Sequence, residues 1–276
     1  MDILDIAKRS LTTLWAQKHL WFFGFFVAVG SGGGSGGSKN GQGGASLAAL
    51  PTWAWILMGV ALVLGLVFLV LHVLSEAALI EGVAEGQKGE RLSIRRGLSR
   101  GRKHFWKLVG LKVLLGLVMV ASFAVIATPA VLAHFGLLPI WLGVTVAVGL
   151  GLVGVPWLLT VYFIYEYAMR LAVLDDHGAL ESIRRARRFL HGRLGLSIKL
   201  TLLTMVGQVG GSAAMGTVMI PAALLAGLAY LIGGLVPAAV VGGGVAIPLI
   251  ILVVGAVGTF RSSVWTLGFI DNHYPA

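Results

Sequence analysis

Charged side chains stand within or at the ends of long apolar stretches of this 276-residue chain. They are two acids, Glu76 and Glu166, two lysines, Lys112 and Lys199, and one arginine, Arg261. An ionised group inside a bilayer is costly, so it pairs with an opposite charge or lines an ion or proton pathway. We favour structural ion pairs, Glu76 with Lys112 and Glu166 with Lys199, because these groups lie near one membrane boundary or can snorkel to it.

A second set of polar and small residues lies in the middle of a later apolar stretch: Gln208, Gly210, Gly211, Ser212 and Thr217. A helix broken there would offer backbone groups to a transported substrate. However, Gly207 and Gly211 also fit the small-xxx-small pattern of closely packed membrane helices, and one glutamine can hydrogen-bond two helices together. We favour packing, and we keep a transport site at Gln208, Gly211 and Ser212 as the alternative.

The sequence gives little indication of a metal site, a cofactor site or a catalytic site. The chain has no cysteine, so thiolate metal sites and cysteine nucleophiles are excluded. Its seven histidines show no pair at metal-ligand spacing, and His72 stands alone in an apolar stretch. We interpret His72 as a packing residue, with contact to a haem or pigment as the alternative. Residues 149–154 match Gly-x-Gly-x-x-Gly, but no strand precedes them. We therefore expect no catalytic site, no metal and no cofactor.

The composition of the chain is strongly apolar, and charged residues are few. Hydrophobic residues make up 57% of the chain and charged residues only 12%, about half the charged fraction of a soluble domain. Several apolar runs reach the roughly 20 residues that cross a bilayer as a helix. The sequence predicts an all-α integral membrane protein, forming a single membrane domain over residues 1–276.

Six transmembrane helices are expected, arranged as three hairpins. The first covers about 11–29 and is interpreted as an uncleaved span rather than a secretory signal. The second runs over 52–74 and continues as helix to about 81. The others cover about 106–131, 140–167, 196–219 and 240–268. Residues 196–237 are too long for one crossing, so we predict a span ending near Met219 and, after Pro221, an apolar segment that lies at the outer surface or folds partly back.

Charge predicts the orientation. Every Lys and Arg but Lys39 falls in the amphipathic start, in two loops between predicted spans or near the end of the last span. The exception lies in a Gly/Ser-rich loop at 31–50, which we expect to be external and flexible. The positive-inside rule then places both termini and both basic loops in the cytoplasm.

The two basic loops share a motif, Ser93-Ile94-Arg95-Arg96 and Ser182-Ile183-Arg184-Arg185. Apolar residues at helical spacing predict two basic amphipathic helices at the cytoplasmic membrane surface. The residues expected to bind anionic lipid headgroups are Arg95, Arg96, Arg100, Arg102, Lys103, Arg184, Arg185, Arg187 and Arg188. The shared motif suggests three repeat units, about 3–86, 87–176 and 177–276. No recognised nucleic-acid motif accompanies the charge, so we expect no nucleic-acid partner.

A family resemblance is carried by Leu20-Trp21-Phe22-Phe23-Gly24-Phe25, by the Ser-Ile-Arg-Arg segments and by Phe105-Trp106-Lys107-Leu108. With the Gly-rich loop, these resemble bacterial polytopic membrane proteins labelled glycerophosphoryl diester phosphodiesterase membrane-domain-like. The resemblance implies about six helices in a bacterial inner membrane and no established activity. No stretch here would encode the soluble phosphodiesterase barrel, so phosphodiester hydrolysis is not expected.

The sequence therefore favours a non-enzymatic membrane protein that acts by contact. It would be an accessory or scaffold subunit of a membrane complex, or a protein that organises lipids. Its expected partners are membrane lipids with anionic headgroups, and a membrane-protein partner or further copies of itself. The alternative is a small transporter or channel with a site at the repeat interface.

Overall fold

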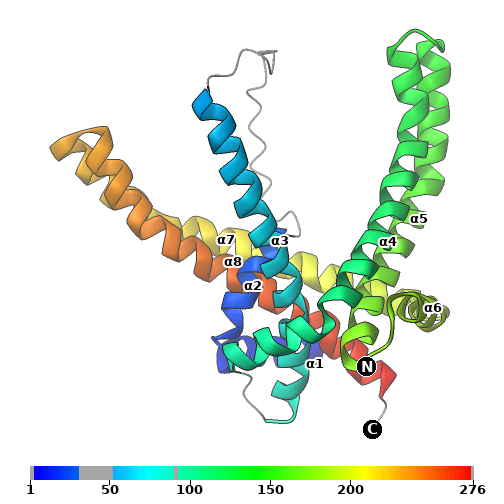
Figure 1. Cartoon of the computed structure of the whole chain (residues 1–276), viewed down its shortest axis with the longest axis horizontal. Coiled ribbons are helices and arrows are strands. Elements are labelled where there is room, and N and C mark those ends of the chain that lie inside the picture. The colour runs from blue at the N-terminus through cyan, green and yellow to red at the C-terminus, as the bar shows by residue number, and fades with distance from the viewer. Residues whose placement is uncertain (1–2, 31–51, 90–92, 275–276) are drawn as a thin grey trace. The chain divides into compact units, whose positions relative to one another are not determined.

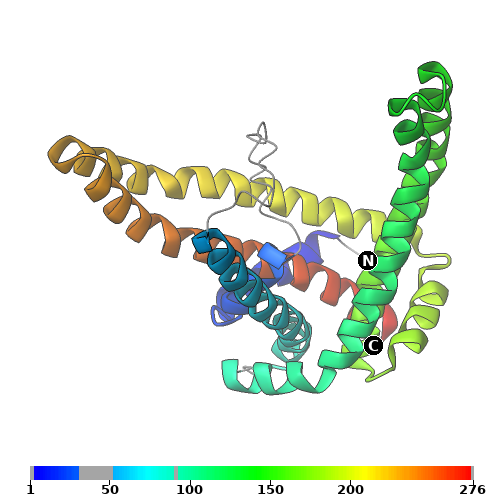
Figure 2. The same cartoon turned by 45° about the horizontal axis from the view of Figure 1, so that its top comes forward.

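The computed structural model describes residues 3–30, 52–89 and 93–274, and over these residues it is almost entirely helical (Figures 1 and 2). The predicted external loop at 31–50, with Lys39, lies outside the described residues. The helices are α1 (Ile3–Ala16), α2 (Leu20–Gly30), α3 (Thr52–Gln87), α4 (Ile94–His134), α5 (Ile140–Leu174), α6 (Ala179–Leu190), α7 (Leu194–Gly233) and α8 (Leu235–His273).

Among the described residues, five helices are long and apolar enough to cross a membrane: α3, α4, α5, α7 and α8. In the most apolar window of each, no more than 11% of the residues are buried inside the protein. Large side chains such as Leu64 of α3 and Leu152 of α5 are 62% and 74% exposed. Hydrocarbon solvates such surfaces and water does not. The chain is an all-α membrane protein.

The chain forms two compact units. The first consists of residues 1–103 and 200–276, and the second of residues 104–199. Because α4 and α7 each begin close to a boundary between the units, most of each helix lies in one unit only. Each unit is described separately below.

The first unit is organised by a close crossing of α2 and α8. Gly24 faces Gly255 and Gly258, and a side chain at any of these three positions would overlap backbone atoms of the opposite helix. Thr259 joins the same crossing, because its Oγ1 donates to the carbonyl oxygens of Leu20 at 3.1 Å and of Gly255 at 2.8 Å. Small residues and a hydroxyl therefore bring two backbones into direct contact, as is common in membrane helix packing.

In the same unit, α7 and α8 run side by side (Figures 1 and 2). Gly207 of α7 lies against the ring of Phe260, and Gly211 lies against Val257. The chain reverses at Gly234, whose φ of 78° is the left-handed conformation that glycine adopts without strain. The α7–α8 hairpin is therefore fixed by small residues on α7 and a glycine turn.

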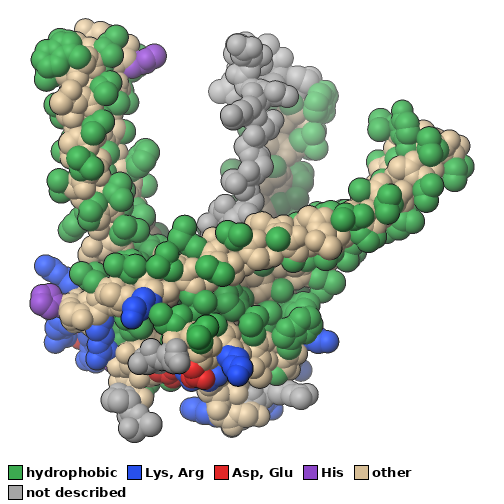
Figure 3. Space-filling view, turned by 180° about the vertical axis from the view of Figure 1, so that it is seen from behind, with side chains coloured by type: hydrophobic (Ala, Val, Ile, Leu, Met, Phe, Trp, Pro, Cys, Tyr) green, Lys and Arg blue, Asp and Glu red, His purple; other side chains and the backbone are tan. Residues whose placement is uncertain are grey.

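In the second unit, α4 and α5 form another hairpin. Gly143 approaches the carbonyl oxygen of Pro129 so closely that a Cβ there would lie 2.9 Å from it. The indole Nε1 of Trp157 donates to Ser122 Oγ at 3.0 Å. Hydrophobic side chains cover this pair along its length, and Lys and Arg side chains gather at the end where α6 lies (Figure 3). The hairpin therefore has one basic end.

The first predicted span is not one helix. The chain turns at residues 17–19, where the N–H of Leu20 bonds to the carbonyl of Gln17 at 2.9 Å. Burial of Gln17 against Gly86 of α3 and the bond from Trp21 Nε1 to the Leu14 carbonyl fix this turn. With 11 residues, α2 is about 16 Å long, roughly half the thickness of a bilayer core. The expectation of a continuous helix over 11–29 is wrong, and the six-span count stays a prediction.

Residues 196–237 also differ from the expectation. The structure has one 40-residue helix, α7, which continues past Met219 and through Pro221 to Gly233. A membrane helix tolerates an internal proline because neighbouring groups satisfy the freed backbone carbonyl. The predicted end near Met219 is therefore wrong.

The two basic segments fold differently. Residues 179–190 form the separate helix α6, which ends before Gly192, whose φ is 86°. Residues 94–107 are instead the first turns of the 41-residue helix α4, which continues directly into the apolar stretch. The expectation of a separate amphipathic helix holds for the second segment and is wrong for the first, where no left-handed residue interrupts the helix.

A substitution at the α2–α8 crossing tests this description of the first unit. We expect Gly255→Val to lower the free energy of unfolding by about 1–3 kcal/mol or more, because the added side chain would overlap the Trp21 backbone. Thermal unfolding in detergent, followed by tryptophan fluorescence, measures the loss. Gly65→Val on α3 is the matched control, since its added Cβ meets no atom within 4 Å beyond its chain neighbours and the nearby backbone of α3 itself. Equal stability of the two variants would contradict the crossing.

Candidate functional site

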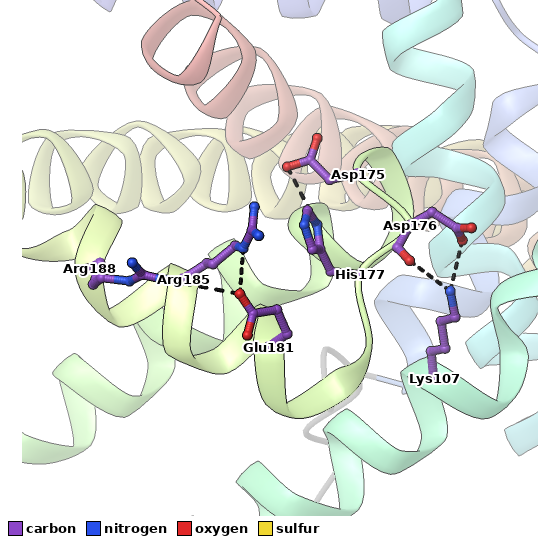
Figure 4. Close-up of polar contacts among 7 residues, drawn as sticks. All are labelled: Lys107, Asp175, Asp176, His177, Glu181, Arg185 and Arg188. Atoms are coloured by element: carbon purple, nitrogen blue, oxygen red, sulfur yellow. Dashed lines mark hydrogen bonds and ion pairs between the residues drawn. The ribbon is translucent and has the colours of Figure 1, made fainter.

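The strongest concentration of polar contacts in the second unit lies where α5 ends and α6 begins (Figure 4). Residues 175–178 connect these helices, and Asp176 has a φ of 57°. Lys107 of α4 donates from Nζ to both the carbonyl oxygen and Oδ1 of Asp176, each at 2.9 Å. The buried His104 places Nδ1 3.3 Å from the same Oδ1. Aspartate tolerates the left-handed conformation better than most residues, and these contacts stabilise it there.

The α6 helix presents one buried face and one basic face. Ser182, Ala186 and Leu190 recur at every fourth residue and are at most 4% exposed. On the other side, Glu181 receives a hydrogen bond from Arg185 Nε at 2.7 Å (Figure 4). The amphipathic character predicted for this segment is confirmed by these contacts.

Glu181 is shared by three arginines. Besides the bond from Arg185, Arg184 NH1 and Arg188 NH2 lie 3.8 and 3.9 Å from its carboxyl oxygens. The hydrogen bond from Arg185 and the neighbouring guanidinium charges lower the pKa of Glu181 below its ordinary value. Glu181 therefore stays ionised at neutral pH, and any stability from these pairs is lost as the pH falls through its lowered pKa.

The end of α6 is held by aromatic contacts. Phe189 packs edge-on against Tyr167 of α5, with ring centroids 4.8 Å apart. The Arg193 guanidinium lies over Phe189, 4.5 Å from the ring centroid. Tyr167 Oη and Ser197 Oγ are 2.9 Å apart within the buried interior. Both ends of α6 are thus fixed, so its arginines have defined positions.

The chemistry that this surface offers is anion binding. Four arginines, Arg184, Arg185, Arg187 and Arg188, share one helix of 12 residues with a single carboxylate, that of Glu181. Arg184 and Arg188 are 76% and 70% exposed at their side chains. Guanidinium groups bind phosphate with two parallel hydrogen bonds. An arginine surplus fixed on a folded helix can bind a phosphate group.

The other predicted headgroup residues lie in the first unit, at the start of α4: Arg95, Arg96, Arg100, Arg102 and Lys103. Arg95, Arg96 and Arg102 are exposed. Arg100 instead forms ion pairs with Glu81 and Glu85 of α3, so part of its charge is neutralised. The excess positive charge at the start of α4 therefore comes from the exposed Arg95, Arg96 and Arg102.

The two predicted acids contact basic partners on their own helices. Glu166 accepts from Arg170 NH1 at 2.7 Å, and both side chains are buried. Glu76 Oε2 lies 3.9 Å from His72 Nε2. Sequence reasoning missed both partners, although the spacing of four residues on a helix is a usable signal. The pairs of Glu76 with Lys112 and of Glu166 with Lys199 stay predictions.

His72 joins α3 to α2. Its Nδ1 lies 2.9 Å from the carbonyl oxygen of Phe26, so this nitrogen must carry the proton. Gly30, at the end of α2, leaves the space that the imidazole ring occupies. The ring is 7% exposed. These contacts support the interpretation of His72 as a packing residue.

The polar set on α7 is divided between two faces. Gly211, like Gly207, packs against α8, whereas Gln208 and Ser212 are exposed on the surface of the helix. Ser212 Oγ donates to the Gln208 carbonyl at 2.9 Å, within an unbroken helix. The glycines therefore fit the packing interpretation, and a broken helix at this position is absent from α7.

Buried hydroxyl groups in the first unit were also missed by sequence reasoning. Ser10 of α1, Ser75 of α3 and Ser263 and Thr266 of α8 are at most 1% exposed. None of these four hydroxyls has a hydrogen-bond partner among the described residues. Thr259, Ser263 and Thr266 are spaced four and three residues apart, which places them on one face of a helix. This spacing could have predicted a polar face that packs against other helices. The interior is more polar than the composition suggests.

Among the described residues, no group of three or more His, Asp or Glu side chains is arranged to hold a metal ion. The features above define a multi-pass helical membrane protein with buried polar contacts and a basic helix at one end of its second unit. The chain belongs to a family of unknown function (DUF7544), which matches residues 4–269. No curated protein and no solved structure matches it. The resemblance to the glycerophosphoryl diester phosphodiesterase membrane-domain-like group stays a prediction.

The contact of His72 with α2 yields a test. We expect His72→Phe to lower the free energy of unfolding by about 1–3 kcal/mol, because it removes the hydrogen-bond donor to the Phe26 carbonyl and leaves that carbonyl beside an apolar ring. His72→Asn keeps a donor near the position of Nδ1 and should recover part of the loss. Thermal unfolding in detergent measures both variants, with the exposed His191→Phe as control. If His72→Phe and His191→Phe melt alike, the tie between α2 and α3 is not stabilising.

Proposed function

We propose that the protein is a non-enzymatic, multi-pass protein of the bacterial cytoplasmic membrane that acts by contact with lipids and with other membrane proteins. In this proposal both termini and both basic segments face the cytoplasm, because lysine and arginine are retained on that side. Six spans in three hairpin repeats remain the expected arrangement.

The observation that carries the proposal is the arginine surface of α6. Its arginines outnumber the single acid of the helix, and contacts at both ends hold the helix in place. A basic helix beside membrane spans attracts anionic headgroups, by about 1 kcal/mol per Lys or Arg near the surface. Such a surface concentrates anionic lipids around the protein, which is what a lipid-organising protein or an accessory subunit of a membrane complex requires.

A role as a scaffold is supported by the exposed small and polar residues of the long helices. Gln208 and Ser212 face outwards from α7, where a neighbouring helix could bond to the Gln208 side-chain amide and donate to Ser212 Oγ. The partner would be another membrane protein or a further copy of this chain. Purification from the native membrane tests this part: a stable co-purifying subunit or a defined oligomer supports it, and a lone monomer contradicts it.

A small transporter or channel is the second candidate. The observation in its favour is the group of buried hydroxyls on α1, α3 and α8, since transported ions or substrates need polar groups inside the membrane domain. Ion or substrate flux into proteoliposomes, abolished by a change such as Ser263→Val without loss of folding, would favour this candidate over the first.

Lipid binding by α6 is tested with two variants of opposite effect. We expect Glu181→Gln to strengthen the preference for phosphatidylglycerol over phosphatidylcholine, because it frees three arginines from their shared acid. Arg184→Gln combined with Arg188→Gln should weaken this preference about five- to twentyfold. Spin-labelled lipids bound to the purified protein report the preference.

Glu85→Gln is the comparison for Glu181→Gln, because it leaves α6 unchanged and removes only one of the two acids paired with Arg100, so its effect on the preference should be smaller. A lipid preference that does not respond to either α6 change would contradict the proposed headgroup contact.

A further inference from the structure

The α1 helix carries an amphipathic face that nothing in the first unit covers. Leu4, Leu11 and Trp15 are 77%, 47% and 62% exposed, and they lie along one side of a 14-residue helix. Lys8, one turn after Leu4, and Lys18, in the turn that follows α1, are also exposed. The opposite side, formed by Ile6, Ser10, Thr13 and Leu14, is buried. The helix is therefore packed on its inner side only.

The inner side is held in place by charge as well as by packing. Arg9 pairs with Asp271 near the end of α8 and with Asp5 one turn earlier on α1, the latter at 3.0 Å. The hydrogen bond to Asp271 raises the pKa of the Arg9 guanidinium, so Arg9 remains positively charged at physiological pH. Arg9 carries one positive charge against the two carboxylates of Asp5 and Asp271, so one negative charge remains in this cluster, whereas the outer face carries Lys8 and Lys18.

The aromatic residues at the end of α1 are of the type that is enriched where membrane helices meet the lipid headgroups. The rings of Trp15 and Trp21 meet edge-to-face with centroids 5.9 Å apart, and Lys18 Nζ lies 5.9 Å from the Trp15 centroid. Trp21 donates its indole N–H to the Leu14 carbonyl, so its position is fixed. Tryptophan and lysine together at a helix end are typical of the headgroup level.

The outer face of α1 differs from that of α6. On α6, arginines occupy most of the exposed positions, and Leu180 is the one large apolar side chain exposed by more than a third among its residues. On α1, apolar side chains alternate with lysines, whose long stems can lie among acyl chains while the ammonium reaches the headgroups. A face of this kind, placed in water, would expose three large apolar side chains.

We propose that α1 lies within one leaflet as a half-embedded helix, with Leu4, Leu11 and Trp15 among the acyl chains and Lys8 and Lys18 at anionic headgroups. This contact extends the proposed function, because it adds an embedded lipid surface separate from the arginines of α6. A helix lying this way displaces lipid from one leaflet only, so its binding depends on lipid packing and composition.

The test uses the absence of cysteine from the chain, which allows a single spin label in each full-length variant. Leu11→Cys is labelled and placed in nanodiscs, and its accessibility to oxygen and to a water-soluble nickel chelate is measured. Leu64→Cys on α3 and Ser99→Cys on α4 give the acyl-chain and aqueous references, since both positions are exposed. Leu4→Cys repeats the measurement in case Leu11→Cys folds poorly.

We expect oxygen to be favoured at Leu11 as it is at Leu64, and the chelate to be favoured at Ser99. A Leu11 label that behaves like the Ser99 label would overturn the proposal. So would a label shielded from both reagents, which would indicate that a protein partner covers α1. Neither result depends on the α6 variants, so this proposal and the proposed function can fail separately.

The charge component is tested by Lys8→Gln combined with Lys18→Gln. We expect the preference for phosphatidylglycerol over phosphatidylcholine to fall about two- to fivefold, with the embedding of Leu11 retained. Lys88→Gln, an exposed lysine beyond the end of α3, is the control and should change the preference less. An unchanged preference in the double variant would show that the two lysines do not bind anionic headgroups.

Discussion

The cost of placing a charge in hydrocarbon is the constraint on which the whole structure depends. A bare ion at the bilayer centre costs several kcal/mol, so charges gather at helix ends or pair with one another. The chain has only 11 acids against 21 Lys and Arg. Within the second unit, Glu166 is neutralised by Arg170 one turn away, and Lys107 by Asp176. The arginines of α6 outnumber the one acid of that helix, and they form the exposed basic surface of this unit.

The same solvent explains how the helices hold together. Lipid tails are as apolar as leucine, so burying apolar surface does not drive one membrane helix against another. The first unit instead uses close backbone approach at Gly24 and Gly255, together with bonds from Thr259 and His72 to carbonyl oxygens of α2. Large apolar side chains such as Leu64 are left on the outside. At the crossing of α2 and α8, small and polar residues therefore make the contacts between helices, while many large hydrophobic side chains lie on the outer surface.

Much of the fold could be predicted from the sequence, because membrane length and apolar runs determine where long helices form. Helix ends were harder to predict. The turn at residues 17–19 depends on Gln17 reaching Gly86 of α3, a contact that no local pattern contains. The basic segments also share a motif, yet only the one followed by Gly192 becomes a separate helix.

The candidate site could be predicted only in part. The spacing of the arginines indicated the basic surface of α6. The expected partners of Glu76 and Glu166, in contrast, were chosen only from their depth in the membrane. Their i,i+4 neighbours His72 and Arg170 were closer in sequence.

The central claim is that both basic segments face the same aqueous compartment, and cysteine labelling tests it most directly. Ser99→Cys and His191→Cys place single thiols beside the two segments, and Ser38→Cys marks the loop that is expected on the opposite side. Cells with a permeabilised outer membrane are treated with a maleimide that cannot cross the inner membrane, before and after that membrane is disrupted. The account predicts that Ser38→Cys reacts at once, and that Ser99→Cys and His191→Cys react only after disruption. Reaction of either one, but not the other, in intact cells would contradict it.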